Sequence, residues 1–165
     1  MKNLTIAIIS PGEMGSAVGQ ALRSNDYRIV TYLEGRSEHT RALARNAGFE
    51  ICQTLTDLVS EADLILSILV PSEAVTAAAE VSKAIVESNS DVYFADCNAV
   101  APETVKRIES NIVSAGGKFI DGSIIGLPPG REIPRFYTAG EHAHTMDELD
   151  GKGLSIRRIS NEVGS

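Results

Sequence analysis

The sequence predicts an α/β fold, a doubly wound and mainly parallel sheet with helices on both faces. Strand-like and helix-like segments alternate along the chain, which is the pattern of a parallel sheet covered by crossover helices. The first strand candidate, 4–9, is a continuous apolar run, as expected for a strand buried on both faces. The segment after it repeats apolar side chains at helical spacing. Right-handed crossovers bring the ligand sites of such a fold to the carboxyl ends of the strands.

Each element is assigned from its residue pattern. Strands are expected where apolar, β-branched and aromatic residues dominate, at 4–9, 27–33, 63–70, 91–97, 118–125, 135–140 and 155–160. Helices are expected at 13–22, 37–48, 56–62, 72–88, 101–117 and 141–151. Ser37 is a plausible N-cap, Gly48 a plausible C-terminal stop, and Pro102 suits a first helical turn. The Pro/Gly-rich segment 123–134 is interpreted as a long surface loop.

The composition limits the class of protein. The 165 residues, of which 43% are hydrophobic, fit one domain with its own core. A net charge of −7 argues against a nucleic-acid or membrane-surface partner. We find no apolar span of transmembrane length and no cleavage signature after the first apolar run, so we expect a cytoplasmic protein. Cys52 and Cys97 give neither a disulfide framework nor metal-ligand spacing, and no metal site is expected.

A glycine-containing turn follows the first strand, with the sequence Ser10-Pro11-Gly12-Glu13-Met14-Gly15. In the dinucleotide fingerprint G-x-G-x-x-G, the first glycine makes the turn, the second lets the backbone approach the pyrophosphate, and the third packs the helix on the strand. Ser10 replaces the first glycine here, and Pro11 presets the turn in its place. A helix that starts near Glu13 directs its free N–H groups and positive end at the turn. The turn alone leaves open a phosphate site or a turn without a ligand.

The end of the second strand carries groups that could hold the adenosine ribose. Glu34 lies roughly twenty residues beyond the turn, where an acid hydrogen-bonds the ribose hydroxyl of NAD. Arg36 and Ser37 follow at a helix start, and an Arg–Ser pair there suits the 2′-phosphate of NADP. We favour NADP, and NAD remains the alternative.

Together these segments resemble the cofactor (N-terminal) domain of the 6-phosphogluconate dehydrogenase and 3-hydroxyisobutyrate dehydrogenase superfamily, as a divergent branch. The glycine turn resembles that family's G-x-G-x-M-G, and 35–37 resembles the Asn-Arg-Thr of its NADP-using members. Leu69-Val70-Pro71 resembles its Met-Leu-Pro loop. The most specific match is 94–108, which resembles a V-D-C-S-T-V-S-P-E-T segment with nicotinamide-side and substrate-side contacts. Residues 119–126 resemble its substrate-facing F-x-D-A-P-V-S-G-G.

The resemblance implies a Rossmann-type domain, NADP (alternatively NAD) as cofactor, and a small hydroxy acid as substrate. It implies cofactor contacts at Ser10, Pro11, Gly12, Glu13, Met14, Gly15, Glu34, Arg36, Ser37, Leu69, Val70, Pro71 and Asn98. It implies substrate contacts at Asn98, Ser123 and Gly126. The sequence departs from the family where Asn98 replaces a Ser, Ala99 a Thr, and Ile125 stands near the Ser of the S-G-G loop.

The family's catalytic acid–base is a lysine on the helix that leads into an all-helical second domain, and that position lies beyond Ser165. We therefore expect residues 1–165 to be the cofactor domain, truncated before the lysine and inactive alone. Full-length family members are expected to be homodimers.

Three functions follow as hypotheses. The first is an NADP-dependent oxidoreductase that transfers hydride between NADP and a small hydroxy acid. The second is a non-catalytic NAD(P)-binding sensor or interaction module. The third, a methyltransferase that uses S-adenosylmethionine, shares the glycine turn and the acid, but the 94–104 segment and the Arg36–Ser37 pair argue against it.

Overall fold

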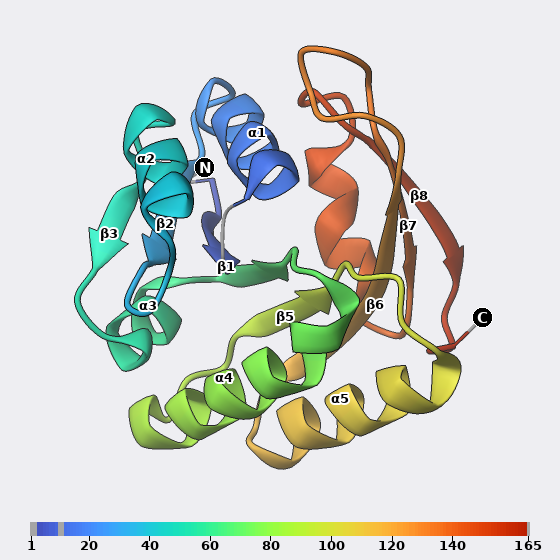
Figure 1. Cartoon of the computed structure of the whole chain (residues 1–165). Helices are drawn as coiled ribbons and strands as arrows, with labels where there is room; N and C mark the ends of the chain where they lie inside the picture. The colour runs from blue at the N-terminus through green and yellow to red at the C-terminus, as the bar shows by residue number, and fades with distance from the viewer. Residues whose placement is uncertain (1–2, 10–11, 165) are drawn as a thin grey trace.

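The computed structural model describes residues 3–9 and 12–164 and is built around one twisted sheet (Figure 1). Within these residues the strands lie side by side in the order β3 (Glu50–Cys52), β2 (Arg28–Tyr32), β1 (Thr5–Ile9), β4 (Leu64–Ser67), β5 (Tyr93–Asp96), β6 (Lys118–Ile125), β7 (Arg135–Ala139) and β8 (Ser155–Ser160). Strands β1 to β6 are parallel, β7 is antiparallel to β6, and β8 is parallel to β7. The predicted α/β doubly wound, mainly parallel class is confirmed. The strand order reverses between β1 and β4, the switch point where such sheets bind ligands.

Helices cover both faces of the sheet, each over its own core. One face carries α1 (Glu13–Arg23), α2 (Glu38–Asn46) and the 3₁₀ segment η2 (Ala143–Leu149). The other carries α3 (Leu55–Glu61), α4 (Ala74–Ser88), preceded by the 3₁₀ turn η1 (Pro71–Glu73), and α5 (Pro102–Ser114). Figure 1 shows α4 and α5 together below the sheet and α1 and α2 above it. None of the helices described here is long and apolar enough to cross a membrane.

The predicted helix at 141–151 is wrong in type, because the structure forms η2 as a 3₁₀ helix. Its buried residues, Ala143, Met146 and Leu149, recur every three positions. Three residues per turn is the period of a 3₁₀ helix, so this spacing keeps all three side chains on the core side.

Two strand predictions also need correction. The short edge strand β3 was not predicted, because Ile51 is exposed and three residues are too few to show an alternation. The strand predicted at 63–70 ends at Ser67, because the Leu69 amide donates to the Asn98 side chain instead of to a neighbouring strand. The predicted helix boundaries at α2 are confirmed. The Ser37 hydroxyl accepts from the Thr40 amide at 3.1 Å, and Gly48 has the positive φ (+78°) of a helix stop.

Helix α1 approaches the start of β3 closely at Gly19. A Cβ atom added there would collide with the ring of Phe49, which is buried in the same core as Val18 and Leu22. Because Gly19 has no side chain, α1 can lie against the ring of Phe49, which directly precedes β3.

We predict that Gly19→Ala lowers the free energy of unfolding by about 1 to 3 kcal/mol, because the added methyl overpacks the core against Phe49. Urea denaturation followed by circular dichroism measures it. Gln20→Ala, one position along the exposed side of α1, is the matched control and should change stability little. Equal stability of Gly19→Ala and the parent chain would show that the contact is not limiting.

Candidate functional site

A cleft of about 590 Å³ lies at the switch point of the sheet. Its lining comes from the ends of β1 and β2, the turn after β2, the start of α3 and the first half of α4. The residues are Ile9, Tyr32, Glu34, Gly35, Arg36, Leu55, Glu73, Ala77, Glu80 and Val81. A smaller hollow of about 150 Å³ adjoins it and extends it from Arg36 to Leu69. The cleft therefore runs from the end of the second strand to the loop after β4.

Negatively charged side chains outnumber positively charged ones in this cleft. Glu34, Glu73 and Glu80 contribute three carboxylates, and Arg36 is the only lining cation among the described residues. The Arg36 Nη1 atom lies 3.9 Å from Oε2 of Glu73, and its side chain is about one-third exposed (31%). The Tyr32 hydroxyl donates to Oε2 of Glu34 at 2.7 Å, and this bond raises the pKa of Tyr32. Arg36 is thus held at the edge of the cleft beside a carboxylate that partly neutralises it.

Two backbone features beside the cleft suit a phosphate-bearing ligand. Gly12 is the N-cap of α1 in extended conformation, and a Cβ added there would meet no atom within 4 Å in the described part of the chain. The space above this helix start is therefore open to a ligand. Gly35 has a φ of +79°, which only glycine adopts without strain, and it turns the chain from β2 toward α2.

The remaining glycine-turn residues divide between core and surface. Gly15 is buried within α1, and Met14 packs against the core of that face. Glu13 is exposed, and its carboxylate lies 3.1 Å from Nε2 of His39 in α2. Ser10 and Pro11, predicted as the altered turn, lie outside the described residues.

The buried side chain of Asn98 joins the ends of two strands. Its Oδ1 accepts from the Leu69 amide at 2.7 Å, and its Nδ2 donates to Oδ1 of Asp96 at 2.6 Å and to the Ser67 hydroxyl at 3.3 Å. Asn98 therefore fixes the loop of Leu69, Val70 and Pro71. Both ends of its amide already bond within the protein.

Two carboxyl groups lie side by side just below this junction. Asp96 and Asp121 are direct neighbours across the β5–β6 pair. Asp96 is buried, its Oδ2 has no hydrogen-bond partner among the described residues, and burial raises its pKa to about 6. Burial also raises the pKa of Asp121, whose Oδ2 accepts from the Gly164 amide at 2.8 Å. Burial likewise raises the pKa of the Cys97 thiol, so this cysteine is a packing residue without thiolate character.

The predicted substrate-side residues lie on another part of the sheet edge. Ser123 is half-buried on β6, two positions beyond Asp121. Gly126, with a φ of +119°, begins the exposed loop to β7, which the carboxylate of Glu132 closes by accepting from the Leu127 amide at 3.2 Å. The predicted surface loop is confirmed over 126–134, while 123–125 belong to β6.

The structure brings Glu34, Arg36 and Leu69 to one connected hollow, and Ser123 and Gly126 lie outside it. The Ser37 hydroxyl caps its own helix at the cleft's rim. Sequence analysis missed Tyr32, Glu73 and Glu80 as lining residues. The last two stand on a helix whose pattern indicated only packing, and no motif marks them.

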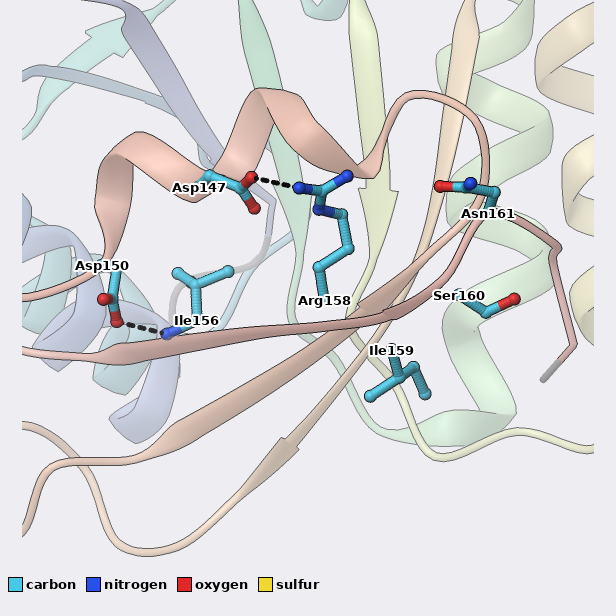
Figure 2. A pocket seen from close by; sticks show the side chains of 7 residues that line it. All are labelled: Asp147, Asp150, Ile156, Arg158, Ile159, Ser160 and Asn161. Carbon is cyan, nitrogen blue, oxygen red and sulfur yellow. Dashed lines mark hydrogen bonds and ion pairs between the residues drawn. The ribbon is translucent and has the colours of Figure 1, made fainter.

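A second polar hollow, of about 500 Å³, lies between η2 and β8 (Figure 2). Its charged groups bond to one another. Arg158 Nη2 lies 3.2 Å from the Asp147 carboxylate, and the Ile156 amide donates to Asp150. Arg158, Asp147 and Asp150 in this hollow therefore already have partners within the protein. In the described ranges we find no group of three side chains that could hold a metal ion.

Comparison with known proteins supports a nucleotide-binding domain. A family model described as the NAD binding domain of 6-phosphogluconate dehydrogenase matches residues 5–135. An uncharacterized 28.5 kDa protein in the 7S RNA 5′ region of Methanothermus fervidus is 29% identical over 161 residues, or 98% of this chain and 60% of that protein.

Solved structures with a similar fold include two proteins. A conserved protein of unknown function, described as structurally similar to 3-hydroxyacid dehydrogenases, superimposes with a TM-score of 0.86 at 28% identity, over 98% of this chain and 59% of that one. 3-Hydroxyisobutyrate dehydrogenase of Mycobacterium tuberculosis, solved with L-serine, gives a TM-score of 0.84 at 15% identity, over 98% and 56%. The second likeness shows the fold alone. The chain spans less than two thirds of the length of each of these relatives.

The raised pKa of Asp96 makes stability depend on pH. Between its unfolded pKa of about 4 and its folded pKa of about 6, only the folded chain holds the proton, so stability falls as pH rises through this window. We predict that Asp96→Asn removes about 2 to 3 kcal/mol of this fall between pH 4 and pH 7. Urea denaturation at several pH values measures it.

The quantity to compare is the difference between variant and parent at each pH. Arg28 lowers the pKa values of Glu50 and Glu61, so the stability that these two side chains contribute is lost as pH falls. This loss affects the variant and the parent chain equally. A slope that Asp96→Asn does not alter would contradict the buried ionisation.

Proposed function

This chain belongs to the family of the NAD-binding domain of 6-phosphogluconate dehydrogenase, and from that membership we propose that it binds NADP for hydride transfer to or from a small hydroxy acid. The observation that carries the cofactor part is the cleft at the switch point, with Arg36 at its edge and the open start of α1 beside it. Residues 1–165 act as the cofactor domain of this oxidoreductase.

The residues present fit a dinucleotide. The open backbone at Gly12, with Gly15 behind it, accommodates the pyrophosphate at the positive end of α1. Ser10, Pro11, Glu13 and Met14 flank Gly12 in the sequence and complete the segment proposed to contact the pyrophosphate. Glu34, Arg36 and Ser37 hold the adenosine ribose and its phosphate. Leu69, Val70, Pro71 and Asn98 border the nicotinamide side. When bound, the nicotinamide supplies or accepts the hydride.

Arg36 is the reason to favour NADP over NAD. A guanidinium beside a helix start pairs with a phosphate through parallel hydrogen bonds, and the first-turn N–H groups of α2 add further donors. The carboxylates of Glu34, Glu73 and Glu80 repel an anion in the same cleft. NAD is therefore the alternative, with Glu34 on the ribose hydroxyls.

The substrate part of the proposal rests on the family and on the residues at the β6 edge. Asn98 keeps the strand ends in place, and Ser123 and Gly126 border the substrate. The lysine that the family uses as acid–base has no counterpart among the described residues at the matching position. A non-catalytic NAD(P)-binding module is the second candidate, because Asn98, which stands on the substrate side in the family resemblance, has both ends of its amide bonded within the protein. A cytoplasmic location and the absence of nucleic-acid and membrane partners stay predictions.

We predict that the chain binds NADPH more tightly than NADH and that Arg36→Ala weakens NADPH binding by about tenfold to a hundredfold. The lost contact is a hydrogen-bonded charge pair worth about 1.5 to 3 kcal/mol. Fluorescence of the reduced nicotinamide during titration measures both affinities. Arg45→Ala is the matched control, because it removes an exposed charge from α2 at a position away from the cleft.

Two outcomes contradict the proposal in different ways. Tighter NADH binding that Arg36→Ala does not change would assign the ribose to Glu34 and the cofactor to NAD. Binding of neither nucleotide, with the protein folded by circular dichroism, would remove the cofactor function and leave only the fold.

Glu73 competes with a phosphate for Arg36, so Glu73→Gln should strengthen NADPH binding by about threefold to tenfold and leave NADH binding nearly unchanged. The gain should shrink at high salt, because screening weakens the repulsion that the variant relieves. The same titration at two ionic strengths measures it. Weaker NADPH binding in Glu73→Gln would mean that Glu73 positions Arg36 instead of competing for it.

A further inference from the structure

One part of the sheet face that carries α4 and α5 has no helix packed closely over it in the described chain. Helix α5 packs on β5 and β6, and the contacts of β7 and β8 with a helical segment are with η2, on the opposite face. The side chains of β7 and β8 that point away from η2 are therefore accessible.

The strand register places polar side chains in two rows on this face. Ser123 of β6 lies opposite Tyr137 of β7, which lies opposite Arg157 of β8. In the next row, toward the end of β6, Ile125 lies opposite Arg135. The alternate positions point the other way, as Phe136 does into the core under η2. Figure 2 shows the same alternation on β8, where Arg158 points toward η2 and Ile159 away from it.

Arg135 and Arg157 form no ion pair with a carboxylate in the described part of the chain, and in this they resemble Arg23, Arg41, Arg107 and Arg131. Arg28, Arg36, Arg45 and Arg158 each lie within 4.0 Å of a carboxylate oxygen. Neither Arg135 nor Arg157 has such a partner among the described residues, in a chain with a net charge of −7. Arg135 Nη1 instead donates to the hydroxyl oxygen of Tyr137 at 3.4 Å. Because that oxygen is used as an acceptor, the phenolic proton is available to donate outward.

These rows lie at the ligand edge of the sheet. Strand β5 ends at Asp96, level with Asp121, and β6 continues beyond it through Ser123 to Ile125. Since β7 runs antiparallel to β6, Arg135 stands at this same extended end. Asp121, one row further in, repels an anion from the inner part of the face and leaves the outer rows as the favourable place.

We propose that Arg135 and Tyr137 bind the carboxylate of a small hydroxy-acid substrate, with Arg157 adding positive charge from the next strand; this assignment rests on the oxidoreductase function proposed above. A guanidinium presents paired N–H donors that match a carboxylate, and the Tyr137 hydroxyl adds a third donor. Ile125, about half exposed (49%) and opposite Arg135, offers an apolar surface to the carbon chain beside that carboxylate.

The test uses the chain labelled with ¹⁵N and follows the Nε–Hε resonance of each arginine during titration. The probe is 3-hydroxypropanoate, and the neutral 3-hydroxypropanamide is its control. We expect a saturating shift at Arg135 in the millimolar range, typical of a small ligand held by one charge pair. The amide should give no such shift. Arg135→Gln and Tyr137→Phe should weaken binding of the acid by about tenfold and about threefold, respectively.

Arg158→Gln is the matched control, because Arg158 lies on the neighbouring strand β8, points to the opposite face of the sheet and pairs with Asp147. It should bind the acid as the parent does. Melting curves of all variants establish that they are folded. An equal response to the acid and to chloride at matched ionic strength would overturn the proposal, as would binding that Arg135→Gln leaves unchanged.

NADPH titration of the same samples separates this inference from the function it rests on. NADPH binding without a carboxylate response at Arg135 overturns the inference and leaves the proposed cofactor function standing. A carboxylate response without binding of either nucleotide supports the anion site and overturns the oxidoreductase proposal.

Discussion

The buried amide of Asn98 holds the ligand edge of the sheet together. It accepts from the Leu69 backbone and donates to Asp96 and Ser67, so the ends of β4 and β5 cannot separate without leaving buried polar groups unpaired. The loop that borders the cleft begins at Leu69, so its position follows from this contact. The burial of the Asp96 carboxyl has the same origin, because Asn98 closes over it. The shape of the nucleotide cleft and the titration of the adjoining acid therefore depend on one side chain.

Charge is divided along this edge in a way that suits two different ligands. The cleft at the switch point has three carboxylates around one arginine, so a phosphate there gains affinity only through Arg36 and the helix starts. The β6–β8 end has a tyrosine and two arginines without carboxylate partners among the described residues, so the remaining guanidinium N–H groups and the phenolic proton can donate to a ligand. Other arginines of the described chain also lack a carboxylate partner, so the argument rests on position: these two lie on one sheet face at the ligand edge, beside Tyr137, which favours recognition of an anion.

The sequence predicts the fold class and several boundaries because those depend on local patterns. The β6 and β8 limits match the strands predicted at 118–125 and 155–160 from their residue content, and the Ser37 cap and Gly48 stop follow from backbone chemistry at single residues. Other features depend on partners far apart in the chain. Glu73 lines the cleft only because η1 lies close to Arg36 in the turn after β2, and the Arg135–Tyr137 pair becomes part of a row only through the register of three strands. Neither contact leaves a periodic signal in the sequence.

Residue type at a motif position also does not decide whether its polar atoms are available to a ligand. Asn98 and Ser37 both stand where the family resemblance implies ligand contacts, yet Asn98 bonds at both ends within the protein and Ser37 caps its own helix. A hydrogen-bonding group already satisfied inside the protein gains little by exchanging partners. The contacts these two segments can still offer come mainly from backbone N–H groups, at the start of α2 and along the loop that Asn98 fixes. On this view the polar motif residues hold the sheet edge in place. The backbone, Arg36 and the Arg135–Tyr137 pair recognise what binds to it.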